Sequence, residues 1–256
     1  MTLVGLETAF DSSVRRLIVN NPKGNVYTGA VMQQLLEAVT AAKADAGVKL
    51  ITLEGAGSHF SFGASVEEHT GDKVADMLPV LRKLVWEIAS SEVPVAALVQ
   101  GVCLGGAFEV VLACHLAFAT PDARMGVPEI RLGVVPPVAA ALLPRKFGQA
   151  VADRLVITGE ELSGERLREL GMVHSCFPAD SLWQGVSSWF EGTFARFSAC
   201  SLRHATRQAR AAFLRRLDRR LEEHEQDYLE KLMASHDANE GIQAFIEKRN
   251  PEWKNA

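Results

Sequence analysis

The 256-residue sequence contains little cysteine, and its cysteine and histidine patterns exclude the common metal sites. Its four cysteines, Cys103, Cys114, Cys176 and Cys200, are widely separated and form no C-x-x-C pair. The seven histidines show no H-E-x-x-H spacing. We therefore expect no bound metal and no disulfide framework, and a reducing, cytoplasmic environment.

The sequence also lacks an excess of positive charge and a long hydrophobic run. Its net charge is −4, so no basic face for nucleic acid is expected. A basic run over residues 203–220 is followed at once by acidic residues. We interpret it as a solvated helix face, with an anion-binding face as the alternative. The most apolar stretch, residues 93–102, is too short to span a bilayer, and the first residues lack a secretory pattern. No nucleic-acid or membrane partner is expected.

Hydrophobic residues make up 48% of the chain, enough to bury a large core in one or two domains. The predicted strands are residues 14–19, 50–53, 93–99 and 116–119. Thr28 is predicted to cap a helix that continues to about Ala44. Strand, glycine-rich loop and helix recur along the chain, which indicates parallel strands with crossover connections and an α/β fold.

The pattern becomes almost purely helical after Ser181. An apolar stripe among charges consists of Leu214, Leu217, Leu221, Tyr228, Leu229 and Leu232. Such a stripe either packs on the body of the protein or forms an oligomer contact, and the sequence does not separate the two. We divide the chain into a core, residues 1–190, and a C-terminal helical region, residues 191–256.

Three loops attract attention because each follows a strand, at the sheet edge where α/β proteins bind ligands. The first, residues 54–65, is rich in small residues that let a ligand approach the main chain. The amide of Ala64 precedes a predicted helix and can point at a developing negative charge. The alternative interpretation is an ordinary flexible loop.

The second loop, residues 101–109, matches neither a Walker motif nor G-x-G-x-x-G. Gly105 and Gly106 start a predicted helix and offer bare N–H groups suited to an oxyanion. Cys103 beside them is interpreted as apolar packing rather than as a nucleophile. Glu109 lies about one turn into this helix among apolar residues. Its carboxylate must therefore be paired, be hydrogen-bonded, or have a raised pKa.

The third loop, residues 125–133, places Glu129 between a proline and an isoleucine. A salt bridge to Arg131 or Arg124 is the structural alternative to a catalytic role. Two carboxylates beside one oxyanion site can act as a general acid and a general base. Glu109 and Glu129 are therefore the candidate catalytic pair.

In this order and spacing, the pair Gly63-Ala64 and the segments 104–109 and 128–133 resemble the crotonase (enoyl-CoA hydratase/isomerase) superfamily. The similarity extends from about Val14 to Trp253. It implies an α/β spiral of repeated ββα units, followed by a C-terminal helical region that builds trimers. A homotrimer or a dimer of trimers is therefore expected.

The resemblance also implies roles for individual residues. The amides of Ala64 and Gly106 would form the oxyanion hole for a thioester carbonyl. Glu109 and Glu129 occupy the positions with which family hydratases activate water and exchange the proton on the substrate carbon. The implied substrate and CoA contacts are Lys23, Val26, Phe62, Gly63, Gly105, Phe245 and Lys248. Phe245 and Lys248 would come from a neighbouring subunit. Coenzyme A is part of the acyl-CoA substrate, so no separate cofactor is expected.

Three segments depart from the family pattern. Residues 136–141 replace a glycine-rich segment, His115 stands where aspartate is common, and residues 60–69 differ from the usual loop. We therefore predict a remodelled acyl pocket. The altered loops are most similar to cyclohexadienecarbonyl-CoA hydratases, which add water at the β carbon and a proton at the far end of the diene. Water addition to a cyclic dienoyl-CoA is the predicted reaction. The alternatives are a CoA-ester isomerase, hydrolase or decarboxylase, and a non-catalytic CoA-binding protein.

Overall fold

The computed structural model describes residues 2–71 and 73–256, and its main element is a six-stranded sheet of order β1-β2-β3-β4-β6-β9. The strands are β1 (Val4–Ala9), β2 (Val14–Val19), β3 (Leu50–Gly55), β4 (Val95–Val99), β6 (Leu116–Ala119) and β9 (Ser175–Cys176). All neighbours pair in parallel except β1 and β2. The four predicted strands and their parallel pairing are confirmed, and the α/β class with them.

The edge strand β1 (Val4–Ala9) was not predicted, because its side chains show no regular alternation of apolar and polar residues. A second sheet, of order β5-β7-β8, contains β5 (Val102–Leu104), β7 (Arg124–Gly126) and β8 (Glu161–Ser163). The amide of Gly105 donates to the carbonyl of Gly126 over 2.9 Å. This small sheet therefore fixes the second and third predicted loops against each other.

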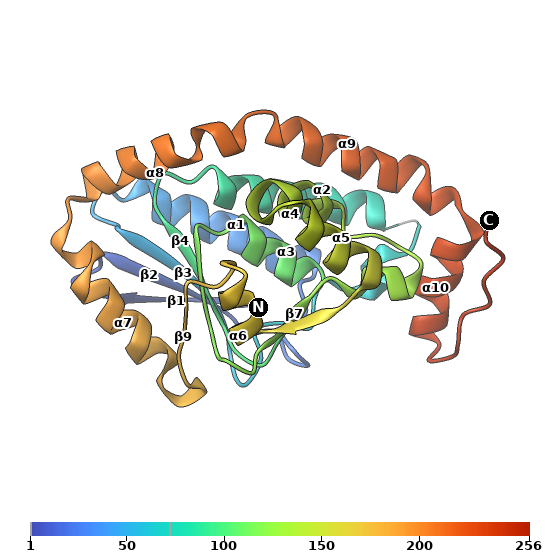
Figure 1. Ribbon diagram of the computed structural model, residues 1–256, viewed down its shortest axis with the longest axis horizontal. Coiled ribbons are helices and arrows are strands. Elements are labelled where there is room, and N and C mark those ends of the chain that lie inside the picture. Colours follow the sequence, from blue (N-terminus) through green and yellow to red (C-terminus); the bar gives the residue numbers. More distant parts are fainter. Residues whose placement is uncertain (1, 72) are drawn as a thin grey trace.

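Helices of the first two thirds of the chain cover one face of the large sheet (Figure 1). They are α1 (Gly29–Ala44), α2 (Val74–Ala89), α3 (Gly106–Ala113), α4 (Pro137–Phe147), α5 (Gln149–Thr158) and α6 (Gly164–Glu169). Thr28 caps α1 as predicted, since its side chain accepts a hydrogen bond from the amide of Val31. Of two short 3₁₀ helices, η1 (Val66–His69) follows the first predicted loop and η2 (Pro128–Leu132) lies within the third.

The C-terminal part is helical, as predicted: α7 (Leu182–Gly192), α8 (Ala199–Leu214), α9 (Leu217–Glu230) and α10 (His236–Ile246). Helices α8 and α9 arch over the helical layer, and α10 lies at the end of the molecule beside the C-terminus (Figure 1). Leu217, Leu221 and Tyr228 are buried in the main core, so the stripe packs on the body. The division at residue 190 stays a prediction. Within the described residues, no helix combines the length and apolar character needed to cross a membrane.

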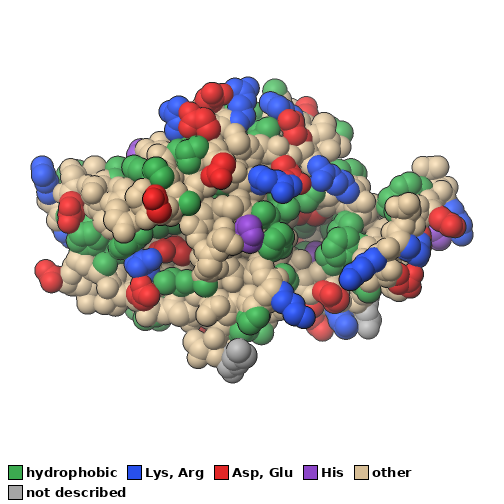
Figure 2. Space-filling model, turned by 90° about the horizontal axis from the view of Figure 1, so that it is seen from below, with side chains coloured by type: hydrophobic (Ala, Val, Ile, Leu, Met, Phe, Trp, Pro, Cys, Tyr) green, Lys and Arg blue, Asp and Glu red, His purple; other side chains and the backbone are tan. Residues whose placement is uncertain are grey.

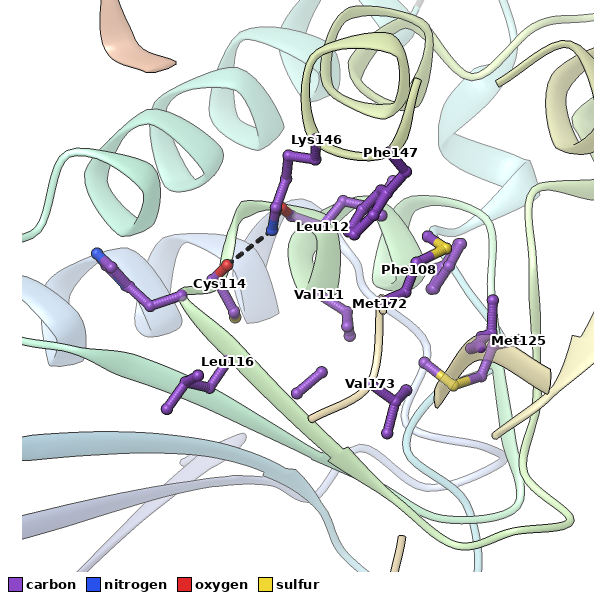
Figure 3. Close-up of a pocket in the computed structure, with 13 residues that line it drawn as sticks. Phe108, Val111, Leu112, Cys114, Leu116, Met125, Lys146, Phe147, Met172 and Val173 are labelled. Carbon is purple, nitrogen blue, oxygen red and sulfur yellow. Dashed lines mark hydrogen bonds between the residues drawn. The ribbon is translucent and has the colours of Figure 1, made fainter. Parts of the chain in front are cut away.

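Two half-buried basic side chains hold the C-terminal end of α3. Lys146 Nζ donates to the carbonyls of Leu112 over 2.7 Å and of Cys114 over 3.0 Å, beside a small apolar cavity (Figure 3). Arg210 of α8 donates to the carbonyls of Ala113 and Cys114. Cations are favourable at a helix C-terminus, so this arrangement fixes the helix whose other end carries Gly106.

The basic run is therefore not a purely solvated face. Arg203, like Arg210, donates to backbone carbonyls of the body, those of Lys43 and Asp45. For these two arginines the interpretation from sequence was wrong, because a helical face that docks on helix ends has the same charge pattern as an exposed one. On the face shown in Figure 2, acidic and basic side chains are interspersed.

Candidate active site

The three predicted loops meet around one cavity of about 480 Å³. The face in Figure 2 is hollowed toward the end of the molecule that carries α10. The predicted site residues that line the cavity are Phe62, Gly63, Ala64, Gly105, Gly106, Glu109, Glu129 and Phe245. Its apolar wall consists of Val66, Leu78, Leu81, Leu132, Val134, Val135, Pro137 and Ile242. The cavity thus combines a large apolar volume with few polar groups, as small-molecule sites do.

Two backbone amides lie side by side at this cavity. A Cβ atom built on Gly106 would lie 3.0 Å from the Cβ of Ala64 and 3.6 Å from its amide nitrogen. Among the described residues, no acceptor is assigned to the amide of Ala64 or of Gly106. Gly105 has a φ of 55°, which favours glycine. The pair can therefore donate to a negative oxygen, with the start of α3 adding its dipole.

The start of α4 holds the carboxylate of Glu109. Glu109 is only 2% exposed, and its Oε1 accepts a hydrogen bond from the amide of Ala139 over 2.8 Å. This amide belongs to the first turn of α4, where backbone N–H groups lack partners within the helix. Residues 136–141, which depart from the family pattern, therefore form the helix start that binds Glu109.

Glu129 has different surroundings. A Cβ on Gly105 would lie 3.1 Å from its Oε1, whereas its buried Oε2 has no hydrogen-bond partner among the described residues. Arg124 and Arg131 both pair with Glu161 instead. The alternative of a structural salt bridge from Glu129 to either arginine is therefore wrong.

The two carboxyl groups differ in proton affinity. Burial raises the pKa of Glu109 to about 7, against the opposing effect of hydrogen bonds from the amides of Ala139 and Val138. Burial, and then the nearby charge of Glu109, raises the pKa of Glu129 well above its usual range. At neutral pH Glu109 is partly ionised, whereas Glu129 is protonated. One site thus contains both a base and an acid.

The remaining predicted contacts lie outside the cavity lining. Lys23 and Val26 belong to a turn that packs on Phe62, since a Cβ on Gly24 would lie 2.0 Å from the Phe62 ring. Lys248 is exposed just after α10. Phe245 lines the cavity of its own chain and is 54% exposed. A role for these residues in CoA binding stays a prediction, as does a contact with a neighbouring subunit.

His69, at the end of η1, lines the cavity and was not predicted as a site residue. Its Nδ1 lies 2.7 Å from the carbonyl of Ser65. Because a carbonyl only accepts, Nδ1 carries the proton in the neutral ring and Nε2 is an acceptor. Burial lowers the pKa of His69 and favours this neutral form. Its signal in the sequence is weak: a histidine one short helix after Ala64.

The amide of Ala139 was also missed, and no residue type could have indicated it, because any residue except proline has such an amide. Among residues 2–71 and 73–256, the structure gathers no group of three or more His, Cys, Asp or Glu side chains suited to a metal ion. Catalysis without a metal or separate cofactor stays a prediction.

Comparison with known proteins gives the family. The model of the enoyl-CoA hydratase/isomerase family matches residues 9–256. The cyclohexa-1,5-dienecarbonyl-CoA hydratase of Thauera aromatica is 42% identical over 245 residues, covering 96% of this chain and 94% of that protein. The 2,3-dehydroadipyl-CoA hydratase of Escherichia coli K12 is 30% identical over 241 residues, covering 93% and 94%.

Solved structures agree with this result. The crystal structure of an enoyl-CoA hydratase from Mycobacterium avium subsp. paratuberculosis K-10 matches with a TM-score of 0.86 at 26% identity, covering 99% of both chains. The predicted superfamily, fold class and hydratase-type enzyme class are confirmed. The chain belongs to the enoyl-CoA hydratase/isomerase family.

Proposed function

We propose that the protein adds water to a cyclic dienoyl-CoA thioester, with Glu109 as base and Glu129 as acid. The observation that carries the proposal is the pair of buried carboxyl groups of unlike proton affinity beside two amides without assigned acceptors. A family isomerase needs only one such carboxylate, so the pair favours water addition over isomerisation. A decarboxylase and a non-catalytic CoA-binding protein do not need such a pair. A hydrolase could use it to activate water, and loss of the thioester would reveal that reaction.

The proposed reaction follows from these protonation states. Ionised Glu109 takes a proton from water as the water oxygen bonds to the β carbon. The electrons of the conjugated system move toward the thioester carbonyl, whose oxygen accepts hydrogen bonds from Ala64 and Gly106. Protonated Glu129 supplies a proton to a carbon atom of the substrate. In a ring diene this carbon is the one at the far end of the conjugated system.

Two findings support a cyclic acyl group. The relative from Thauera aromatica carries that activity in its name and is 42% identical over nearly the whole chain. In addition, the segment that replaces the glycine-rich loop contributes Pro137 to the cavity wall beside Val134 and Val135. Bulky side chains there narrow the space for an extended chain. His69 adds a hydrogen-bond acceptor, its Nε2, to the cavity lining.

The substrate partner in this proposal is the acyl-CoA itself, with the exposed Lys23 and Lys248 near the nucleotide end. Assembly as a homotrimer or a dimer of trimers, and a cytoplasmic location, belong to the same proposal. Phe62 and Phe245 are 50% and 54% exposed beside the cavity, which leaves apolar surface for a neighbouring subunit or for CoA to cover.

The test compares cyclohexa-1,5-dienecarbonyl-CoA with crotonyl-CoA. The wild type is expected to turn over the ring substrate faster than crotonyl-CoA. Turnover is measured as the loss of the absorbance of the conjugated system. Glu109→Gln and Glu129→Gln should each lower kcat by about 10²- to 10⁴-fold. The exposed Glu37→Gln serves as the control and should match the wild type. Fast turnover of crotonyl-CoA alone contradicts the cyclic substrate, and full activity of either glutamine variant contradicts the assigned pair.

A further inference from the structure

A tyrosine of the C-terminal helical region lies close to the glutamate pair without belonging to any predicted motif. Tyr228, on α9, is 1% exposed, and its hydroxyl has no hydrogen-bond partner among the described residues. Buried hydroxyl groups in folded proteins are nearly always hydrogen-bonded. An unpaired one therefore requires a specific explanation.

Helix α9 is fixed against the segment that holds Glu109. His224 Nδ1 lies 3.1 Å from the carbonyl of Pro137, at the start of α4 and on the cavity wall. Tyr228 follows His224 by four residues and so lies on the same face of α9, one turn further. This face of α9 packs against α4, and Tyr228 is buried there in the main core.

The electrostatics agree with this placement. After burial, the charges of Glu129 and Glu109 are the next causes that raise the pKa of Tyr228. The hydroxyl thus remains protonated at neutral pH and is a donor. Glu129 Oε2 is itself buried and without a partner among residues 2–71 and 73–256. One unused donor and one unused acceptor therefore occur in the same buried region.

Other charged groups between α9 and its neighbours have partners elsewhere. Arg82 of α2 pairs with Asp218 and Glu225 of α9, and Arg145 of α4 donates to the carbonyls of Ala212, Phe213 and Arg215. None of these groups is bonded to the Tyr228 hydroxyl. The two carboxyl groups are the ionisable groups identified as acting on it, together with its own burial.

We infer that Tyr228 is a positioning residue for Glu129, and that its hydroxyl stabilises the Glu129 carboxylate formed when the acid has given its proton to the substrate. The inference rests on the proposed function, in which Glu129 ionises once per turnover. It gives α9 a part in the reaction, because an unpaired buried carboxylate is costly and a single donor lowers that cost. The hydroxyl need not touch the substrate.

The test is Tyr228→Phe, which keeps the ring and removes only the oxygen. We expect kcat to fall about 10- to 100-fold with little change in KM, as for a hydrogen bond to a charged group. The pH–rate profile should also change. Its alkaline limb, set by the pKa of the general acid Glu129, should move to higher pH because the ionised form of Glu129 has lost a donor. Glu225→Gln is the control on α9, and its kcat should match the wild type.

Thermal unfolding distinguishes this role from simple packing. If the hydroxyl is only an unpaired buried group, Tyr228→Phe gains stability, with Tm rising by about 2 °C or more, and keeps wild-type kcat and pH profile. That result overturns the inference while the wild type still hydrates its substrate. If the wild type hydrates no enoyl-CoA, the proposed function fails first. A fall in kcat with a shifted profile and no gain in Tm supports the positioning role.

Discussion

Glu109 and Glu129 are the same residue type in one cavity, yet their neighbours give them different proton affinities. Burial raises the pKa of Glu109 to about 7, and hydrogen bonds from amides of α4 oppose that rise because they favour its ionised form. Glu129 lacks a partner for Oε2 and experiences the charge of Glu109, so it retains its proton. The proposed division into base and acid therefore depends on backbone donors rather than on the glutamates themselves.

Burial of Glu109 should make stability depend on pH. Its pKa is about 7 in the folded protein, against 4.5 for an ordinary glutamate. The folded state therefore binds the proton more tightly, and stability falls as the pH rises through this window, by about 3 kcal/mol in all. Glu109→Gln does not lose stability in this way. Urea unfolding should therefore show that its free energy of unfolding, relative to the wild type, is higher at pH 8 than at pH 5. A gain that is the same at both pH values contradicts the raised pKa.

The amide of Gly106 can be tested separately from its small size. Gly106→Pro removes the N–H at the first position of α3, where proline is tolerated. Gly106→Ala introduces a Cβ near Ala64 but keeps the N–H. Loss of one oxyanion donor should lower kcat by about 10²- to 10³-fold beyond the effect of alanine. Equal kcat values for the two variants would show that this amide does not stabilise the transition state.

At the scale of the element, the start of α4 determines how Glu109 titrates. Ala139→Pro should remove the donor to Glu109, while proline in the first helical turn breaks no helix hydrogen bond. The acidic limb of the pH–rate profile, set by the pKa of the base Glu109, is expected to move up by about one pH unit, because the ionised form of Glu109 loses a hydrogen bond. Ala139→Gly keeps the amide and serves as the control. A profile that is unchanged in the proline variant would remove α4 from the tuning of Glu109.

Local patterns predicted several elements but not the contacts between them. The helix after Thr28 and the four parallel strands follow from capping and apolar runs within short windows. The bond between Ala139 and Glu109 joins residues 30 positions apart, and its donor is a backbone group common to nearly every residue. The motifs indicated Glu109 and Glu129, whereas Tyr228 was expected only as part of an apolar stripe. Its nearness to the carboxyl groups follows from how α9 crosses α4.

At the scale of the whole molecule, α9 contributes side chains to the same core as the sheet and α1–α5. Leu221 is 2% exposed within that core. Leu221→Ala should therefore lower the free energy of unfolding by about 2–5 kcal/mol and leave a single transition. Ile157→Ala, at a position 67% exposed, is the matched control and should change stability little. Two separate unfolding transitions would instead favour the predicted division into residues 1–190 and 191–256 as independent units.

Different elements supply the polar groups of the cavity and much of its apolar wall. The amides and carboxyl groups come from the Ala64 loop, α3 and η2, whereas much of the apolar wall comes from Leu78 and Leu81 of α2 and from Ile242 of α10. Changing the size of these three side chains alters the room for the acyl group and leaves the two carboxyl groups and the two amides in place. An enzyme built this way is a practical starting point for engineering: a library confined to two helices can screen new acyl-CoA substrates while the carboxyl groups and amides stay unchanged.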